Sequence, residues 1–237
     1  MGEAEAVPWK ADRTWPAGSY LSQLSRESRQ ALVDAGAQVS YGPDELLFRE
    51  GDPASYLLVI RTGLAKVTAS SESGQETLLA IRCPGDVIGE LSALEKTPLR
   101  SATVAPAGHV TAWRVSHRVF FRLAEDHPDL GAALFRVVTA KLRSATVARV
   151  EVHTYSVRVR LARVLLSLAD SLGSRQEDGM VLDVALSQAE LAALVSASPV
   201  SVARALREFR KAGMLESGYR QLKLRDRAAL TEVAHGS

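Results

Sequence analysis

The feature that most constrains the fold is a change in the residue pattern near residue 115, from short apolar runs between turns to a long run without turn residues. From about Val39 to Val115, short runs of β-branched and aliphatic residues alternate with clusters of turn-forming residues. Between Asp129 and His153, by contrast, the chain has no proline and, after Gly131, no glycine. The first pattern is typical of strands and the second of one long helix. The sequence therefore predicts an α+β chain whose β part comes first.

The β part contains short apolar runs spaced by roughly 8–12 residues, which is typical of an all-β sandwich or barrel. The predicted strands are Leu46–Arg49, Tyr56–Thr62, Ala65–Ala69, Thr77–Arg82 and Val110–Val115. Each such strand buries only one face, so it needs a second sheet opposite. Short helices are expected before the first strand, within Leu21–Ala35.

The helical part begins with a short helix capped by Ser116. Pro128 suits the first turn of the next helix, which runs to about His153. One face of that helix is apolar: Leu130, Leu134, Val137, Val138, Leu142, Ala145 and Val152. A helix this long projects beyond a small barrel, so the stripe needs a partner, and a second copy of the chain is the simplest one. The alternative is that the stripe packs entirely on its own barrel.

The C-terminal third predicts a helix-turn-helix. An amphipathic helix spans Val157–Leu172, followed by a polar loop to Gly179 and a short strand, Val181–Val184. Ser187 and Glu190 have capping-box spacing at the start of a helix that runs to Val195. After a turn at Ser196-Ala197, Ser198 caps a second helix, Pro199–Ala212, which ends at Gly213.

The second helix buries an apolar face and leaves basic residues on its surface, which favours DNA binding. A hairpin follows, with strands Met214–Glu216 and Arg220–Leu224 and a turn at Ser217-Gly218, and completes a winged helix. On the wing, Arg220, Lys223 and Arg225 are expected to reach phosphate oxygens. The alternative is an ordinary helical hairpin with a solvated basic face. The predicted DNA-binding residues are Ser187, Gln188, Ser198, Pro199, Val200, Ser201, Arg204, Arg207 and Arg220.

Composition narrows the function classes. Of the charged residues, 12 basic and 9 acidic side chains lie in 157–237, against 17 and 18 in 1–156, which fits a nucleic-acid partner for the C-terminal third.

The single cysteine, Cys83, excludes an internal disulfide and argues against an iron–sulfur cluster or zinc finger. His109 and His117 are interpreted as packing or surface residues rather than haem ligands, and no metal site is expected. No apolar run reaches the ~20 residues of a membrane span, and the N-terminus lacks a signal-peptide pattern, so we expect no membrane association and a cytoplasmic location.

One local pattern is specific. Gly89-Glu90-Leu91-Ser92 is followed by Arg100-Ser101-Ala102-Thr103, which resembles the phosphate-binding cassette of the cyclic-AMP receptor protein (CRP/FNR) family of transcription regulators. The resemblance extends over about residues 20–225. It implies an N-terminal cyclic-nucleotide-binding double-stranded β-helix (jelly roll), a long dimerisation helix and a C-terminal winged helix-turn-helix. The implied parts are 1–19 (arm), 20–127 (effector-binding β-roll), 128–154 (dimerisation helix) and 155–237 (DNA-binding domain).

The residue types in this cassette fit a cyclic nucleotide. Arg100 can hold a phosphate through two guanidinium N–H groups. The resemblance gives Glu90 the ribose 2′-hydroxyl, and the alternative is a surface ion pair between Glu90 and Arg100. Lys141 falls at a basic position that neutralises Glu90. The predicted ligand-binding residues are Gly89, Glu90, Leu91, Ser92, Arg100, Ser101, Lys141 and Thr146.

Two departures from the family pattern affect specificity. The Thr-Ser pair that contacts adenine in the best-known member is Ala145-Thr146 here, and only Thr146 offers a side-chain hydroxyl. The resemblance makes cAMP the expected effector, while this departure leaves cGMP, another nucleotide or no nucleotide open. The Arg-Glu pair at the start of the recognition helix is Pro199-Val200, and only a later arginine is matched, by Arg204. We expect Arg204 to read a guanine and the operator to differ from the best-known consensus.

These observations give three hypotheses. The first is a homodimeric DNA-binding transcription regulator controlled by cAMP; the resemblance also implies RNA polymerase as a partner, with Leu172–Gly179 as the candidate contact. The second is a regulator of the same fold whose pocket is vestigial or binds another effector. The third is a barrel enzyme with an accessory DNA-binding domain. No catalytic set is visible in the sequence, so we expect the chain not to be an enzyme.

Overall fold

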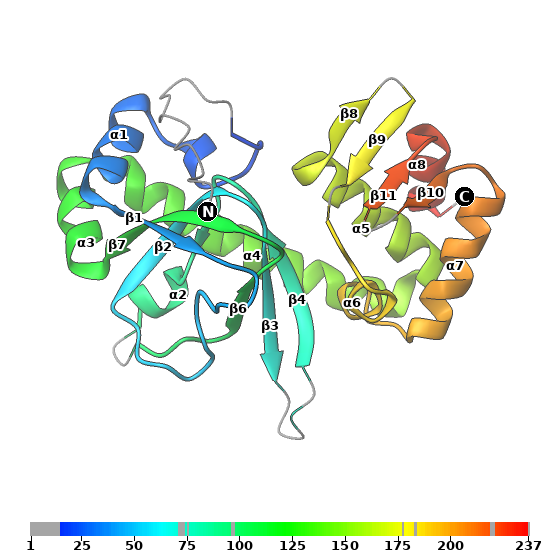
Figure 1. Ribbon diagram of the computed structural model, residues 1–237, viewed down its shortest axis with the longest axis horizontal. Helices are drawn as coiled ribbons and strands as arrows, with labels where there is room; N and C mark the ends of the chain where they lie inside the picture. The colour runs from blue at the N-terminus through cyan, green and yellow to red at the C-terminus, as the bar shows by residue number, and fades with distance from the viewer. Residues whose placement is uncertain are drawn as a thin grey trace, which may run out of the picture.

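The structure is a computed structural model that describes residues 15–70, 74, 76–95, 98–176, 178–182, 184–218 and 221–236. Figure 1 shows an N-terminal β-rich lobe and a C-terminal lobe that is mainly helical. The long helix α4 (Pro128–Thr154) joins them. The predicted order of a β domain followed by a helical part is confirmed.

The N-terminal lobe consists of two antiparallel sheets. One sheet has the order β1 (Ala37–Tyr41), β7 (Val110–Ser116), β2 (Tyr56–Thr62) and β5 (Val87–Ile88), and the other has the order β4 (Glu76–Arg82), β3 (Ala65–Ser70) and β6 (Thr103–Pro106). Alternate residues of β2 serve two cores, because Leu58 and Ile60 face the interior of the roll while Leu57 and Val59 face the helices outside.

Some expectations about the strands were wrong. The Leu46–Arg49 segment is not a strand; its residue Phe48 forms only an isolated bridge with Val104. Strands β1, β5 and β6, the last of which supplies that bridge partner, were not among the predicted strands. Strands β5 and β6 have only two and four residues, too few for their alternation to be visible in the sequence, and β1 has no buried residue to mark an inward face.

Helices cover the outer face of the β1–β7–β2–β5 sheet. They are η1 (Leu21–Gln23), α1 (Arg26–Ala35), α3 (His117–Asp126) and the first half of α4. The Ser116 hydroxyl caps α3 as predicted. Trp15 and Ser19, which the sequence placed in the arm, are buried, so the packed lobe begins earlier than residue 20. The Tyr20 hydroxyl donates to the carbonyl of Leu130, 3.1 Å away, and ties this segment to α4.

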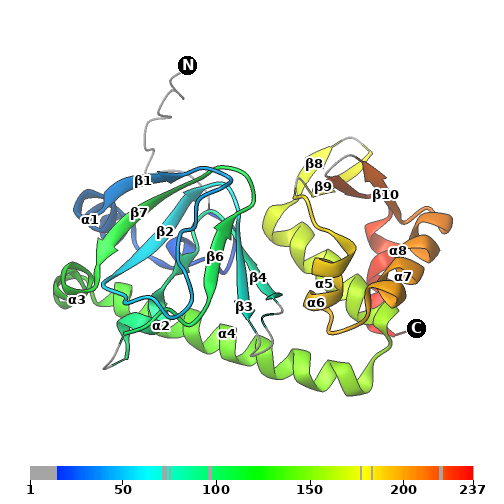
Figure 2. The same ribbon diagram turned by 60° about the horizontal axis from the view of Figure 1, so that its bottom comes forward.

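Helix α4 changes its environment along its length. Its first turns bury Leu130, Ala133 and Leu134 against the N-terminal lobe. Further along, Phe135 and Leu142 are 73% and 69% exposed. At 27 residues the helix is about 40 Å long, and Figure 2 shows it passing along the β-roll to reach the C-terminal lobe. The apolar stripe is therefore only partly used within this chain.

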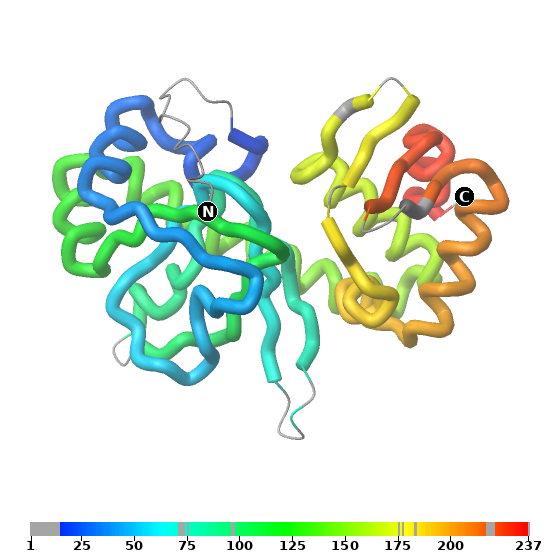
Figure 3. Tube along the Cα trace, in the orientation of Figure 1, coloured from blue at the N-terminus to red at the C-terminus, as the bar shows by residue number. Residues whose placement is uncertain are grey.

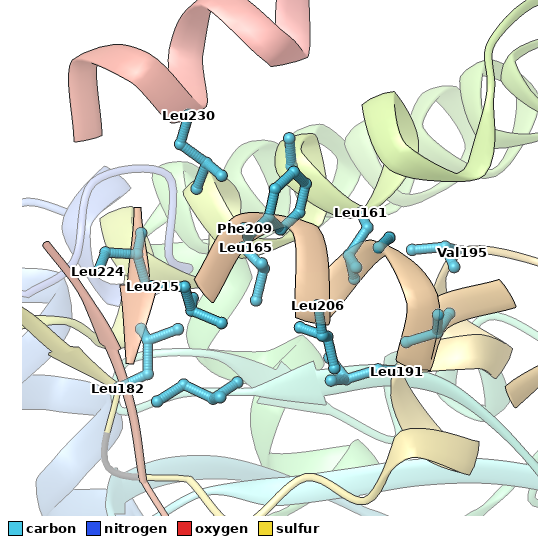
Figure 4. Packing of buried hydrophobic residues seen from close by; sticks show 14 of the residues in the cluster. Leu161, Leu165, Leu182, Leu191, Val195, Leu206, Phe209, Leu215, Leu224 and Leu230 are labelled. Carbon is cyan, nitrogen blue, oxygen red and sulfur yellow. The ribbon is translucent and has the colours of Figure 1, made fainter. Parts of the chain in front are cut away.

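The C-terminal lobe is a winged helix-turn-helix, as predicted. Its elements are α5 (Val157–Leu172), β8 (Ser174–Gln176), β9 (Gly179–Leu182), α6 (Gln188–Leu194), α7 (Pro199–Lys211), β10 (Leu215–Gly218), β11 (Gln221–Leu224) and α8 (Arg227–His235). Figure 4 shows leucines from α5, α6, α7 and the strands converging on Phe209. This core fixes α7 against the rest of the lobe.

Three details differ from the sequence-based expectation. The Gly173–Gly179 segment is not all loop, because β8 pairs with β9. The wing strand β10 continues through Gly218, so the turn does not fall at Ser217-Gly218. Helix α8, capped by Asp226, was not expected.

The two lobes also touch away from α4. Leu78 and Ile81 of β4 belong to the hydrophobic core of the C-terminal lobe. Beside them, Lys66 Nζ lies 2.5 Å from Glu190 Oε1 and 3.0 Å from the carbonyl oxygen of Ala185. The tube in Figure 3 shows β3 and β4 on the side of the β-roll that faces this lobe.

Candidate functional site

The candidate ligand site starts at the turn after β5. Gly89 has φ +78° and precedes the short helix α2 (Glu90–Ala93). A Cβ atom at this position would lie 2.4 Å from Arg100 Nη1 and 3.0 Å from Phe48 Cζ. Glycine is therefore required both by the backbone and by the close approach of the Arg100 guanidinium.

The Arg100 side chain is buried, at 5% exposure. Its Nη1 donates to Ser92 Oγ at 3.2 Å and its Nη2 to the Tyr56 carbonyl at 2.9 Å. The guanidinium lies 3.6 Å from the centre of the Phe48 ring. In the described part of the chain no carboxylate forms an ion pair with it, and burial lowers its pKa. A buried cation without a counter-ion favours the binding of an anion.

Glu90 is paired with α4 rather than with Arg100. Its Oε1 lies 2.7 Å from Lys141 Nζ, and the ammonium also donates to the Val87 carbonyl at 3.3 Å. The carboxylate side chain is only 5% exposed, so the alternative of a surface ion pair between Glu90 and Arg100 does not hold. Burial lowers the pKa of Lys141, and the Glu90 charge opposes that shift. This pair links the cassette to the long helix.

The structure brings together only part of the predicted ligand set. Gly89, Glu90, Ser92, Arg100 and Lys141 share one region, as the contacts above show. Ser101 and Leu91 are exposed. Thr146 is also exposed, and its hydroxyl donates to the Leu142 carbonyl of its own helix at 3.0 Å. Five residues separate Thr146 from Lys141, so the two side chains point about 140° apart around α4.

Sequence reasoning missed the aromatic walls of this site. Phe48 and Tyr56 both stack near Arg100, at 3.6 and 4.6 Å, and their rings lie 5.7 Å apart. A second guanidinium, that of Arg114, lies 5.5 Å from the Tyr56 ring. The signal for Tyr56 was present, since alternation along β2 places it on the same inward face as Leu58 and Ile60.

The candidate nucleic-acid surface is the exposed face of α7. Val202, Ala205, Leu206 and Phe209 are buried, which turns the opposite face outward. Val200 is 78% exposed, and Arg204 and Arg207 are exposed on the following turns. Side chains four apart lie on one helix face, so Val200 and Arg204 form one stripe.

The caps of the helix-turn-helix have the predicted geometry. Ser187 Oγ accepts from the Glu190 amide at 3.1 Å, and Glu190 Oε2 accepts from the Ser187 amide at 2.8 Å. Ser198 Oγ accepts from the Ser201 amide at 3.2 Å and lies 3.0 Å from the Ser201 hydroxyl. The Ser201 hydroxyl is thus part of the cap. Gln188 is exposed at the start of α6.

The structure pairs the described basic residues of the wing with carboxylates, and their expected phosphate contacts stay a prediction. Arg220 lies outside the described residues. Lys223 and Arg225 both form ion pairs with Asp178, and Arg225 also lies 2.8 Å from Glu216. These cations are neutralised within the lobe, because β8, β9 and the wing strands form one sheet that brings the Asp178 turn beside them.

Other kinds of site find little support among the described residues. No group of three or more His, Cys, Asp and Glu side chains in that part of the chain has the arrangement of a metal site. Cys83 is buried, and burial raises the pKa of its thiol to about 12. No single described helix is long and apolar enough to cross a membrane; only α6 and α7 together, bent by 100°, satisfy that criterion of length and composition.

Comparison with known proteins agrees with this geometry. Residues 38–127 match the family model of the cyclic nucleotide-binding domain, and residues 159–233 match that of the Crp-like helix-turn-helix domain. A "CRP-like cAMP-activated global transcriptional regulator" from Mycobacterium tuberculosis is 28% identical over 204 residues, which cover 86% of this chain and 91% of the relative. The regulator LdrP from Thermus thermophilus is 28% identical over 195 residues, covering 80% and 93%.

Solved structures show the same architecture. The transcriptional regulator TTHB099 from Thermus thermophilus superposes with a TM-score of 0.68 at 27% identity, covering 84% of this chain and 97% of that one. FixK2 from Bradyrhizobium japonicum has a TM-score of 0.71 at 23% identity, with coverage of 84% and 96%, and shows the fold alone.

A β-roll that matches the cyclic nucleotide-binding domain and a winged helix-turn-helix together define a DNA-binding transcription regulator. The chain belongs to the CRP/FNR family of transcription regulators. The names of its relatives confirm the prediction that it is a regulator and not an enzyme.

Proposed function

We propose that the protein is a homodimer that binds cAMP in its β-roll and, in response, binds operator DNA in the cytoplasm. The observation that carries the effector part is the state of Arg100, a guanidinium at 5% exposure with no carboxylate paired to it in the described chain. An anion placed against it recovers the electrostatic energy that its burial costs.

The remaining cassette residues have complementary roles in this proposal. The Ser92 and Ser101 hydroxyls and the amides of the Gly89–Ser92 turn supply further donors to the cyclic phosphate. Glu90 accepts from the ribose 2′-hydroxyl, and Lys141 Nζ, 2.7 Å from Glu90 Oε1, pairs with that carboxylate. Leu91 lines the turn. The name of one relative, the cAMP-activated regulator of Mycobacterium tuberculosis, supports this proposal.

The proposed base contact falls on α4. Thr146 lies on the exposed half of α4, so its hydroxyl reaches a nucleotide only across a dimer interface or after α4 moves. Ala145 offers no side-chain hydrogen bond. We therefore keep cGMP as the competing effector, to be distinguished by titration.

In the proposed complex with DNA, the two α7 helices of a dimer lie in successive major grooves. Arg204 reads a guanine, and Val200 beside it gives the helix an apolar contact in place of a charged one. Ser187, Gln188, Ser198, Pro199, Ser201, Arg207 and Arg220 contact or approach the phosphate backbone. RNA polymerase is a further proposed partner, through the segment 172–179.

Calorimetric titration with cAMP and with cGMP tests the effector. We expect saturable binding of cAMP to the wild type and at least a tenfold loss in Arg100→Ala, since hydrogen bonds to charged groups contribute about 1.5–3 kcal/mol. Arg118→Ala, an exposed arginine of the same lobe, is the matched control and should bind as the wild type does. Absence of binding to either nucleotide would overturn the effector proposal.

Selection of duplexes from a random DNA pool tests the second part. Arg204→Ala should weaken binding by about 1–3 kcal/mol and relax the preference at one base pair. Arg207→Ala should weaken all duplexes alike and lower the salt slope by about one. Failure of the wild type to enrich any sequence would contradict operator binding whatever the effector result.

A second candidate is a regulator of the same fold that responds to a different effector. It is favoured by the present packing of Arg100, which already donates to Ser92 and to the Tyr56 carbonyl and stacks on Phe48. In that case DNA binding persists, neither cyclic nucleotide binds, and Arg100→Ala leaves the regulation of DNA binding unchanged.

A further inference from the structure

A buried arginine lies at the junction of the long helix and the DNA-binding lobe. Helix α4 ends at Thr154, and α5 begins at Val157. One turn into α5, Arg160 is 7% exposed. None of the functions described above uses this residue, and no sequence motif singled it out.

Every hydrogen bond of the Arg160 guanidinium in the described structure goes to a main-chain carbonyl. Two acceptors are at the end of α4: Tyr155 at 2.6 Å and Val152 at 3.3 Å. Two are in the turn of the helix-turn-helix: Val195 at 2.9 Å and Ser196 at 3.3 Å. One side chain therefore holds the last turn of the dimerisation helix to the turn that precedes the recognition helix.

Electrostatics explains how this cation is buried without a paired carboxylate. Both sets of acceptors lie at the C-terminal ends of helices, α4 and α6, where carbonyl groups have no partner within the helix. These ends carry the negative pole of the helix dipole, which favours a cation. The planar guanidinium presents N–H groups in divergent directions, so it can serve two carbonyl clusters at once.

The turn that Arg160 grips determines where α7 starts. Ser196 is the one non-glycine residue with positive φ in the described chain, at +50°. Two residues later Ser198 caps α7, whose exposed face carries Val200 and Arg204. A shift of α4 relative to this turn would therefore move the start of the recognition helix.

We propose that Arg160 is a positioning residue for operator recognition: it fixes the recognition helix relative to α4 and so sets the separation of the two helices in a dimer. This inference rests on the proposed function, since it assumes a dimer formed through α4 that reads two half-sites. Two other arginines of α5 serve as comparisons. Arg163 ties α4 to α8 through Glu151, at 2.5 Å, and the Ala234 carbonyl, at 2.7 Å. Arg158 lies at the surface, 3.7 Å from Glu208 and with its guanidinium 5.8 Å from the centre of the Phe209 ring.

The test compares full-length wild type, Arg160→Lys and the control Arg158→Lys on two duplexes. The first is a two-half-site duplex selected from a random pool by the wild type, and the second has one half-site scrambled. Lysine keeps the charge, but its single ammonium cannot reach both carbonyl clusters. We expect Arg160→Lys to bind the one-half-site duplex within about twofold of the wild type and to lose at least tenfold of the preference for two half-sites, whereas Arg158→Lys keeps that preference.

Each other result has a distinct meaning. Retention of the preference in Arg160→Lys would overturn the inference and leave operator binding standing. An equal loss on both duplexes, together with a lower melting temperature, would show a merely structural role and would also overturn it. A wild type that selects no duplex would instead overturn the proposed DNA-binding function itself, and the inference with it.

Discussion

Two of the buried arginines are satisfied in different ways, and the difference bears on function. Arg160 donates to main-chain carbonyls on both sides, so its N–H groups are used by the protein. Arg100 donates to Ser92 Oγ and to the Tyr56 carbonyl, and its guanidinium lies against the rings of Phe48 and Tyr56. In the described chain no carboxylate forms an ion pair with it, and it lies beside the Gly89 turn. Of the two, Arg100 is therefore the one that we propose as a contact for an anionic ligand.

A substitution at Gly89 tests whether the close approach of the Arg100 guanidinium to this residue matters for nucleotide binding. Gly89→Ala places a Cβ 2.4 Å from Arg100 Nη1 and forces a non-glycine residue to φ +78°. We expect a loss of about 1–2 kcal/mol in the free energy of unfolding from the left-handed backbone, and at least tenfold weaker cAMP binding from the displaced guanidinium. Thermal unfolding and calorimetry measure the two effects.

Gly18→Ala is the matched control, because Gly18 has φ +83° and nothing within 4 Å of the added Cβ. It should show the backbone cost and leave nucleotide affinity unchanged. Equal nucleotide affinity of Gly89→Ala and the wild type would contradict the role given to this close approach.

At the scale of elements, helix boundaries were predictable where a serine caps the first turn. Ser116, Ser156, Ser187 and Ser198 each accept from a first-turn amide, and a hydroxyl before an apolar-periodic run is a local signal. Strands β5 and β8 were not predictable, because they have two and three residues and depend on partners distant in the sequence. Helix α8 was missed although Asp226 caps it, since its apolar residues pack only in the assembled lobe.

The candidate site shows the same division between local and tertiary information. The Gly89–Ser92 turn and Arg100 were visible as a motif, and alignment of the long helix with the family pattern predicted that Lys141 lies near Glu90. Phe48 was not, because it lies in a segment without regular strand structure and reaches Arg100 only through the bridge to Val104. Thr146 was included by register alone, and the structure leaves it exposed.

The exposed half of α4 predicts the oligomeric state. Leu142 is 69% exposed in the single chain, so Leu142→Glu should leave the fold intact and place a charge in the proposed helix–helix interface. We expect the variant to sediment as a monomer at micromolar concentration while the wild type sediments as a dimer. Its melting temperature will fall only as far as dissociation requires.

Ser144→Glu introduces the same charge about 200° away around the helix, at an exposed position. This control should remain dimeric. A wild type that sediments as a monomer, or a Leu142→Glu variant that stays dimeric, would rule out dimerisation through this stripe.

At the scale of the whole molecule, the lobes are joined at two places that differ in chemistry. The first is the α4–α5 junction, where Arg160 and Arg163 bind main-chain and side-chain oxygens. The second is the contact of β3 and β4 with α6, where Leu78 and Ile81 lie beside the Lys66–Glu190 pair. Glu190 also completes the capping box of α6, so this contact joins the N-terminal lobe directly to the helix-turn-helix.

The second contact should depend on pH. Burial alone would raise the pKa of Glu190, but hydrogen bonds from Lys66 and from the Ser187 amide lower it below its ordinary value. A lowered carboxyl pKa stabilises the folded state above the unfolded pKa of about 4.3, and this stabilisation is lost as pH falls through the lower, folded value. The contribution of the pair, up to about 1 kcal/mol for a partly exposed ion pair, should therefore be present at pH 7 and decrease as the pH falls through the folded pKa of Glu190.

Lys66→Met isolates that contribution, because it removes the ammonium and leaves the capping box between Ser187 and Glu190 in place. The measurement is the difference in melting temperature between the wild type and Lys66→Met from pH 7 to pH 3. We expect the wild type to be the more stable at pH 7 and the difference to vanish as Glu190 is protonated, since the ammonium then has no charge to pair with.

Lys223→Met, which removes a cation paired with Asp178 inside the C-terminal lobe, is the control for an ion pair that does not join the lobes. Limited proteolysis at pH 7 should cut between the lobes faster in Lys66→Met and at the wild-type rate in Lys223→Met. A pH-independent difference in melting temperature would mean that Lys66 acts through its bond to the Ala185 carbonyl and not through Glu190.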